Sequence, residues 1–321
     1  MPNPHIRRTL LGVVAGAAVA GLCGLAEAAS TGWGDVAAVG LILVVGFPHG
    51  AADLATLSDL RLGSGTAGRL GLYLAAMGLT AALWWWAPVL GLLAFLATAV
   101  VHFGQDQAAS LGSAWRRLSG GRRWVYALAW GAFAVGAPLA WHPVAFAPVT
   151  EAMLGAHLPA GVLSAAAWGA GGAGALALGL AVDAGRRFGG RWWAEVGLLV
   201  ALAVGYALLP GLWGFAAFFI GVHSATSVVN QLRWRGRRPS WPAVGAFLRE
   251  GAPYAVLAVV GVIAAAVAEV GVAVTPAWLA TFFVLVSVVT TPHAVVVFLA
   301  AERAGEAGGA VTEDRLASRG A

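Results

Sequence analysis

The chain lacks most of what covers the surface of a water-soluble protein. It has no lysine, and only 10% of its 321 residues are charged, against about 25% in ordinary soluble domains. Its only cysteine, Cys23, excludes an intrachain disulfide and a cysteine-based metal site. Because 60% of the residues are hydrophobic, the sequence predicts a membrane protein.

Long hydrophobic stretches recur along the chain, and a spanning helix needs roughly 20 apolar residues. We expect about ten transmembrane helices in an all-α, polytopic helical bundle. They cover residues 9–29, 35–57, 67–87, 88–111, 123–142, 160–182, 193–209, 210–232, 252–273 and 276–301. Residues 1–302 should form a single transmembrane domain, and residues 303–321 a short, disordered cytoplasmic tail.

Prolines and small residues mark some of the boundaries between these spans. Pro88 and Pro210 suit the first turn of a helix and predict two tight hairpins. The segment 143–158 is expected to form a short interfacial helix. The first stretch resembles a secretory signal with a cleavage site at residues 26–28, but we expect it to be retained.

The basic residues predict the orientation of the bundle. All nineteen are arginines, and the net charge is +5. They cluster in alternate loops, and the intervening loops have none, which is the positive-inside pattern. We therefore expect a multi-pass protein of the cell (inner) membrane with both termini cytoplasmic. The clusters face anionic lipid, and they do not indicate a nucleic-acid partner.

Four histidines lie inside four different hydrophobic stretches. They are His49, His102, His223 and His293. The four spans run in the same direction, and at about 1.5 Å per residue the histidines lie at one depth within about a helical turn. A histidine in hydrocarbon needs a partner and marks a functional site. Four at one level predict a shared metal ion; the alternative is four separate helix–helix hydrogen bonds. His5, His142 and His157 are assigned no role in the site.

Three polar residues follow three of these histidines at a spacing of four. Asp53 follows His49, Asp106 follows His102, and Ser227 follows His223. This spacing places each pair on one helix face, so the polar group can orient a ligand histidine of its own or a neighbouring helix from the second shell. The alternative is that the aspartates pair with Arg61 or Arg116. Asn230 and Gln231 are expected to face the lipid headgroups.

The ligand set and its surroundings narrow the chemistry. Neutral imidazoles leave the full charge on a divalent ion, and the scarcity of polar residues argues against hydrolysis by zinc. A redox metal between apolar walls suits the reaction of O2 with a lipid-soluble molecule, so we expect Fe2+. No reductant site is evident, and an electron-rich polyene could itself supply the electrons. Pro48 and Pro292 are expected to kink their helices and open space beside the metal.

The histidine motifs together resemble a known family. FPHGAADLATL around His49, VHFGQDQ around His102, GVHSATS around His223 and TPHAVVV around His293 are similar, in this order, to the bacteriorhodopsin-related (Brp/Blh) membrane β-carotene 15,15′-dioxygenases. The resemblance implies an iron enzyme that cleaves the central double bond of β-carotene with O2 to give two molecules of all-trans retinal. It maps iron ligands onto His49, His102 and His223, and it suggests a rhodopsin as the recipient of retinal.

One residue departs from the family pattern. The third motif of the family has two ligand histidines four residues apart, and this chain has Ser227 at the second position. Either His293 completes the set, or water does, or iron binding is weakened. The alternatives to a dioxygenase are a non-catalytic carotenoid- or retinal-binding protein that assists a rhodopsin, and a histidine-based metal or proton transporter. A transporter should have polar residues in successive layers, whereas here one layer dominates.

Overall fold

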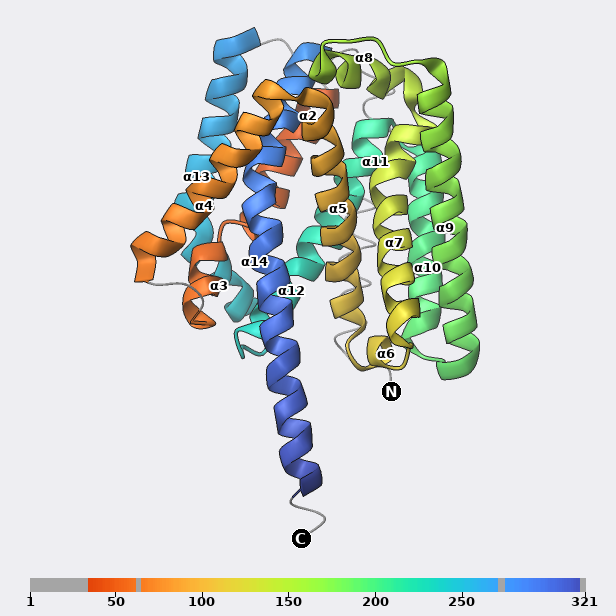
Figure 1. Cartoon of the computed structure of the whole chain (residues 1–321), viewed down its shortest axis with the longest axis vertical. Coiled ribbons are helices and arrows are strands. Elements are labelled where there is room, and N and C mark those ends of the chain that lie inside the picture. The colour runs from red at the N-terminus through yellow and green to blue at the C-terminus, as the bar shows by residue number, and fades with distance from the viewer. Residues whose placement is uncertain (1–33, 62–64, 271–274, 318–321) are drawn as a thin grey trace.

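The computed structural model describes residues 34–61, 65–270 and 275–317, which form a bundle of helices without any strand (Figure 1). The expected all-α class is therefore confirmed. The expected first span and Cys23 lie outside the described residues. The elements up to the middle of the chain are α2 (Gly34–Leu41), η1 (Ile42–Gly46), η2 (Phe47–His49), α3 (Asp53–Asp59), α4 (Gly65–Trp86), α5 (Pro88–Leu111), α6 (Ser113–Arg116), α7 (Gly120–Trp141) and α8 (Pro143–Leu154). They are followed by α9 (Ala160–Phe188), α10 (Arg191–Leu208), α11 (Gly211–Phe218), η3 (Phe219–Ser224), α12 (Ala225–Trp234), α13 (Trp241–Val270) and α14 (Pro276–Ala317).

Among the described residues, eight helical segments are long and apolar enough to cross a membrane. They are Gly34–Asp59, Pro88–Leu111, Gly120–Trp141, Gly161–Phe188, Arg191–Leu208, Gly211–Trp234, Trp241–Ala268 and Pro276–Arg303. Each of the eight overlaps one of the expected spans. The expected span 67–87 corresponds to α4, which has 22 residues but is not among the eight. Both expected hairpins are present, because α5 begins two residues after α4 ends, and α11 begins three residues after α10 ends.

Two of the spanning segments are broken in the middle. The segment Gly34–Asp59 passes from α2 through the π-helical turn η1 and the 3-10 turn η2 before α3 begins. Pro48 lies in this break and has no amide hydrogen to continue an α-helix. The second break is the π-helical turn η3, between α11 and α12. By contrast, α14 runs through Pro292 as one helix, so the two prolines have different consequences.

The two breaks pack directly against each other. A Cβ atom on Gly46 of η1 would lie 2.5 Å from the ring of Phe219 in η3, so only glycine permits this approach. The Ser224 hydroxyl donates to the Gly46 carbonyl at 3.2 Å and to the Phe219 carbonyl at 2.7 Å. The hydroxyl thereby binds carbonyl groups at the broken helical turns. Single π-turns of this kind are frequent at functional sites.

Helices α5 and α7 meet backbone to backbone at two glycines. A Cβ atom on Gly104 would lie 2.0 Å from the Ala127 carbonyl oxygen, and one on Gly131 would lie 1.9 Å from the Val100 carbonyl oxygen. Small residues permit such close helix packing in lipid. Because His102 lies between Val100 and Gly104, this contact fixes the depth and rotation of that histidine.

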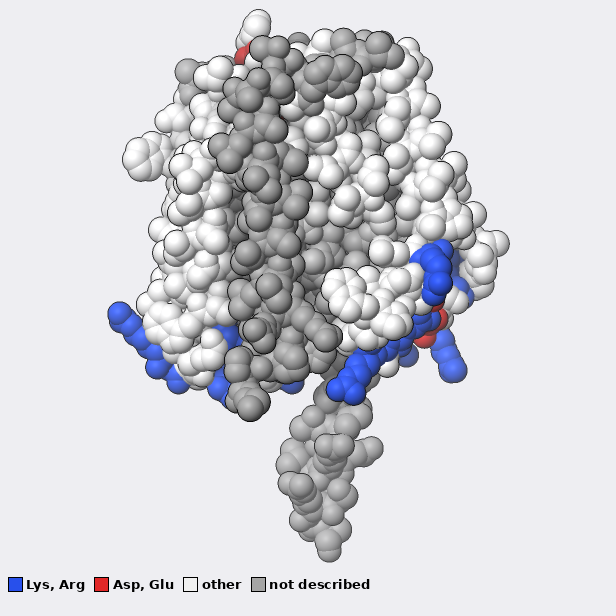
Figure 2. Space-filling view, turned by 180° about the vertical axis from the view of Figure 1, so that it is seen from behind, with Lys and Arg blue, Asp and Glu red and all other residues white. Residues whose placement is uncertain are grey.

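The two ends of the bundle differ in charge. Arginines gather at one end in Figure 2, whereas α8, the short helix expected after residue 142, lies at the other end in Figure 1. This distribution agrees with the alternation of arginines in the sequence. At the arginine-rich end, α14 continues to Ala317 and projects from the bundle, where a disordered tail from residue 303 was expected.

Candidate metal centre

Four histidines from four elements converge in the middle of the bundle. His49 comes from η2, His102 from α5, His223 from η3 and His293 from α14. Each has a ring nitrogen within 4.8 Å of a ring nitrogen of all the others. All four side chains are buried, with at most 4% of each residue exposed. The four histidines, which were expected to lie at one depth, thus form one cluster in space. We call this cluster the four-histidine group.

The four rings form a closed square. Neighbouring ring centroids are 4.8 Å apart for His49 and His223, and 4.9 Å for the other three adjacent pairs. Neighbouring planes lie nearly perpendicular, at 78–90°. Every histidine therefore has two histidine neighbours and faces the same centre.

The outward nitrogens of His49 and His293 are held by hydrogen-bond acceptors, and that of His223 lies near a carboxylate. His49 Nδ1 donates to the Gly46 carbonyl, and His293 Nδ1 donates to Asp53 at 2.9 Å. His223 Nδ1 lies 3.3 Å from Asp106 Oδ2. A proton on each Nδ1 leaves the lone pair on Nε2, so these acceptors select the tautomer that binds a metal through Nε2.

The inward nitrogens fit a bound cation. His49 Nε2 and His223 Nε2 are 3.1 Å apart, within hydrogen-bond distance of each other, and both would be ligand atoms if a cation took the place of the shared proton. His293 Nε2 and both ring nitrogens of His102 are buried without a hydrogen-bond partner among the described residues. Buried polar atoms without a partner are costly, and a metal ion at the centre of the square would satisfy His293 Nε2 and one ring nitrogen of His102.

Two buried carboxylates supply the charge that the neutral ligands lack. Asp53 and Asp106 are 2% and 1% exposed. Tyr73 donates to Asp53 at 3.1 Å, and Asn230 donates to Asp106 at 2.7 Å. When both carboxylates are ionised, their two negative charges equal the charge of one divalent cation.

Neither carboxylate bonds the histidine that precedes it by four residues. Asp53 binds His293 and Asp106 faces His223, each on another element. For Asp53 the reason is that the spacing rule holds only in a continuous α-helix, and residues 50–52 form a turn between η2 and α3. Asp106 and His102 share the continuous helix α5, yet Asp106 faces His223.

Two residues expected to face the headgroups are buried beside the site instead. Asn230 binds Asp106, and Gln231 donates to the His49 carbonyl at 3.0 Å. Gln231 in turn accepts a hydrogen bond from Thr56 at 3.0 Å. Ser227 is fully buried, and its hydroxyl lies 3.4 Å from the Gln231 amide. In a regular helix that continues from His223, residues 227 and 230 lie on the same face. This spacing could have identified Asn230 from the sequence.

The remaining histidines lie elsewhere. His142 contacts the Tyr206 carbonyl at 2.7 Å, and His157 pairs with Glu151 at 2.9 Å. His5 lies outside the described residues. Sequence reasoning also missed Tyr73, because no spacing relates α4 to the broken segment that it contacts.

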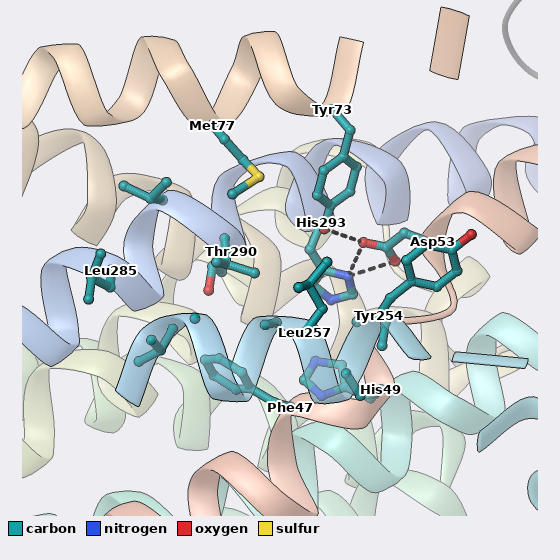
Figure 3. Close-up of a pocket in the computed structure, with 18 of the residues that line it drawn as sticks. Phe47, His49, Asp53, Tyr73, Met77, Tyr254, Leu257, Leu285, Thr290 and His293 are labelled. Atoms are coloured by element: carbon teal, nitrogen blue, oxygen red, sulfur yellow. Dashed lines mark hydrogen bonds and ion pairs between the residues drawn. The ribbon is translucent and has the colours of Figure 1, made fainter. Parts of the chain in front are cut away.

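The four-histidine group opens into an apolar cavity of about 420 Å3. Figure 3 shows its residues between α4, which carries Tyr73 and Met77, and α13, which carries Tyr254 and Leu257. Phe47, Phe103 and Phe219 line it around the histidines. This volume falls in the range of small-molecule sites, which are mostly apolar with a few fixed polar groups.

One comparison with known proteins gives a match, and it covers most of the chain. The family model described as Beta-carotene 15,15'-dioxygenase matches residues 40–300, which include all four histidines. No curated protein and no solved structure gives a significant match.

Proposed function

Because the chain belongs to the beta-carotene 15,15'-dioxygenase family, we propose that it cleaves β-carotene at its central double bond with O2 to give two molecules of all-trans retinal. The observation that carries this proposal is the buried four-histidine group beside an apolar cavity. Both atoms of O2 end on the two carbons of the broken double bond. The reaction therefore needs no external reductant, in keeping with a site that has no evident place for one.

We propose Fe2+ as the metal, held by Nε2 of His49, His223 and His293 and by one ring nitrogen of His102. When bound, iron would supply the redox chemistry that lets O2 react with the electron-rich polyene. Asp53, Asp106 and the Gly46 carbonyl would hold three ligand rings in place through Nδ1.

The residues around the group would position the hydrocarbon and exclude water. Phe103 packs on His223 with ring centroids 4.5 Å apart, and Phe219 packs on His49 at 5.6 Å. These rings form apolar walls next to the ligands, so a polyene could lie against them without leaving a polar group unpaired. Tyr73 would keep Asp53 oriented toward His293.

The departure at Ser227 does not leave the group short of a nitrogen donor. His293 occupies the fourth corner of the square, and Ser227 contacts Gln231. This arrangement favours the dioxygenase over the non-catalytic carotenoid-binding protein, for which the missing histidine was the main argument. It also favours the dioxygenase over a transporter, because the four ligands form a single layer.

The proposed activity predicts that a carotene-producing bacterial host will lose its colour and accumulate retinal when the chain is expressed. Chromatography of the pigments should give two molecules of retinal for each β-carotene consumed, because a central cut yields two equal halves. Longer apocarotenals would indicate cleavage at another bond. Carotene that co-purifies unchanged with the protein would indicate the binding function instead.

We propose that the protein lies in the cell membrane with both termini on the cytoplasmic side. The basis is the arginine-rich end of the bundle. Reporter fusions after Arg117, Arg187 and Arg235 should then report a cytoplasmic location. A fusion at Glu151, on α8, should report the outside. An external location at any of the three arginine loops would contradict this orientation.

A further inference from the structure

The cavity beside the four-histidine group has two walls that belong to the outside of the bundle. Leu70, Tyr73, Leu74 and Met77 of α4 form one wall, and Tyr254, Leu257, Ala258 and Gly261 of α13 form the other. Both helices pack against α14, which contributes the residues between them, including His293 (Figure 3). The cavity is therefore bounded by two peripheral helices, α4 and α13, on the side away from α7.

Several wall residues line the cavity and also face the surroundings of the bundle. On α4, Leu70 is 42% exposed and Leu74 is 54% exposed. On α13, Tyr254 is 48% exposed and Leu257 is 71% exposed. A side chain that is in contact with both the cavity and the exterior marks a rim, so these four residues outline an opening between the two helices.

The surroundings of this opening are hydrocarbon. No charged residue follows Arg69 in α4, and none occurs in residues 251–268 of α13. Exposed leucines and valines without charges are stable in lipid and not in water. The opening therefore faces the bilayer rather than the aqueous phase.

The α13 side of the opening is lined by small residues at the level of the cavity. Gly261 is exposed, and a Cβ atom added to it would meet no protein atom within 4 Å. Ala258 lies one turn before it on the same wall. The space that a larger side chain would fill at residue 261 is thus the opening itself.

We propose that the carotene enters the site sideways from the bilayer through this opening between α4 and α13, a route that rests on the proposed function of the four-histidine group. A carotene hydrocarbon is dissolved in the membrane, so this route requires no passage through water. The apolar rim admits the chain, and the phenylalanines beside the histidines receive it.

Replacing Gly261 with phenylalanine should obstruct the opening without displacing protein atoms. In liposomes that contain β-carotene, we expect G261F to form retinal at least about tenfold more slowly than the wild type, because the added ring overlaps the path of the substrate. Iron per chain should be unchanged, because residue 261 does not belong to the four-histidine group. G261L gives the same test with a smaller side chain, and it serves if G261F accumulates poorly.

Gly197 of α10 provides the matched control. It is also exposed on a spanning helix, and a Cβ atom there also meets nothing within 4 Å. G197F should retain both wild-type iron and the wild-type rate. Wild-type rates in G261F and G261L, with full iron, would overturn the lateral route while leaving the proposed activity intact.

An inactive wild type would refute the proposed function but would still permit a test of the route. The measured quantity is then the carotene absorbance that co-purifies with each protein. Retention by the wild type and G197F but not by G261F supports the opening as the path to the cavity. Equal retention in all three, or none in the wild type, overturns it.

Discussion

Replacement of His102 by alanine is expected to release iron and abolish retinal formation. Both ring nitrogens of His102 are buried and have no hydrogen-bond partner among the described residues, and a metal at the centre of the square would give one of them the partner that it lacks. Iron affinity should fall by more than about 100-fold, the upper range for loss of a supporting group alone. The measurements are iron per chain in purified protein and retinal yield in a carotene-producing host.

His142→Ala is the matched control for this prediction. His142 is partly buried between α7 and α8, and it contacts the Tyr206 carbonyl, away from the four-histidine group. Membrane insertion and iron content should remain at wild-type levels in this variant. If His102→Ala and His142→Ala lost iron equally, His102 would have to be regarded as a structural residue.

Replacement of Asp53 by asparagine should weaken iron binding by about 10- to 100-fold without removing the site, which is the usual effect of losing a group that holds a ligand histidine. Asparagine keeps the volume of the side chain, but it removes the charge and leaves a weaker acceptor for His293 Nδ1. Asp106→Asn should have a similar effect through His223. Competition with a chelator measures the affinity directly.

Asp183→Asn provides the comparison for these two substitutions. Asp183 is also paired, but with Arg122 and Arg187 at the arginine-rich end of the bundle. Removal of its charge should leave iron affinity unchanged, because exposed ion pairs contribute little. Wild-type affinity in both Asp53→Asn and Asp106→Asn would contradict the role that we assign to the two carboxylates.

The arrangement of the four histidines was accessible from the sequence, because it depends on depth alone. Spans that run in the same direction place residues at predictable levels, and small changes in helix geometry shift each level by only a few ångströms. The rotation of each side chain is a different quantity, and it depends on every helical turn being regular. The π-turns η1 and η3 alter the rotation of His49 and His223, and no local sequence pattern specified them.

The pairing of carboxylates with histidines could not be predicted for the same reason. Asp53 and His293 are 240 residues apart in sequence, and their contact depends on where the break in the second span leaves Asp53. Glu195 is a second example. It is buried and accepts hydrogen bonds from Tyr126 at 2.6 Å and Gln107 at 2.7 Å. These partners come from two other helices, α7 and α5. A single sequence does not show which residues of different helices lie side by side.

The glycine contact between α5 and α7 gives the two sides of the molecule different responses to the membrane. On that side the backbones touch at Gly104 and Gly131, and no change of rotamer can alter their separation. On the other side, the outer faces of α4 and α13 meet only lipid chains. Under the proposed function and route, bilayer thickness and fluidity would act on the uptake of substrate and not on the spacing of the four histidines.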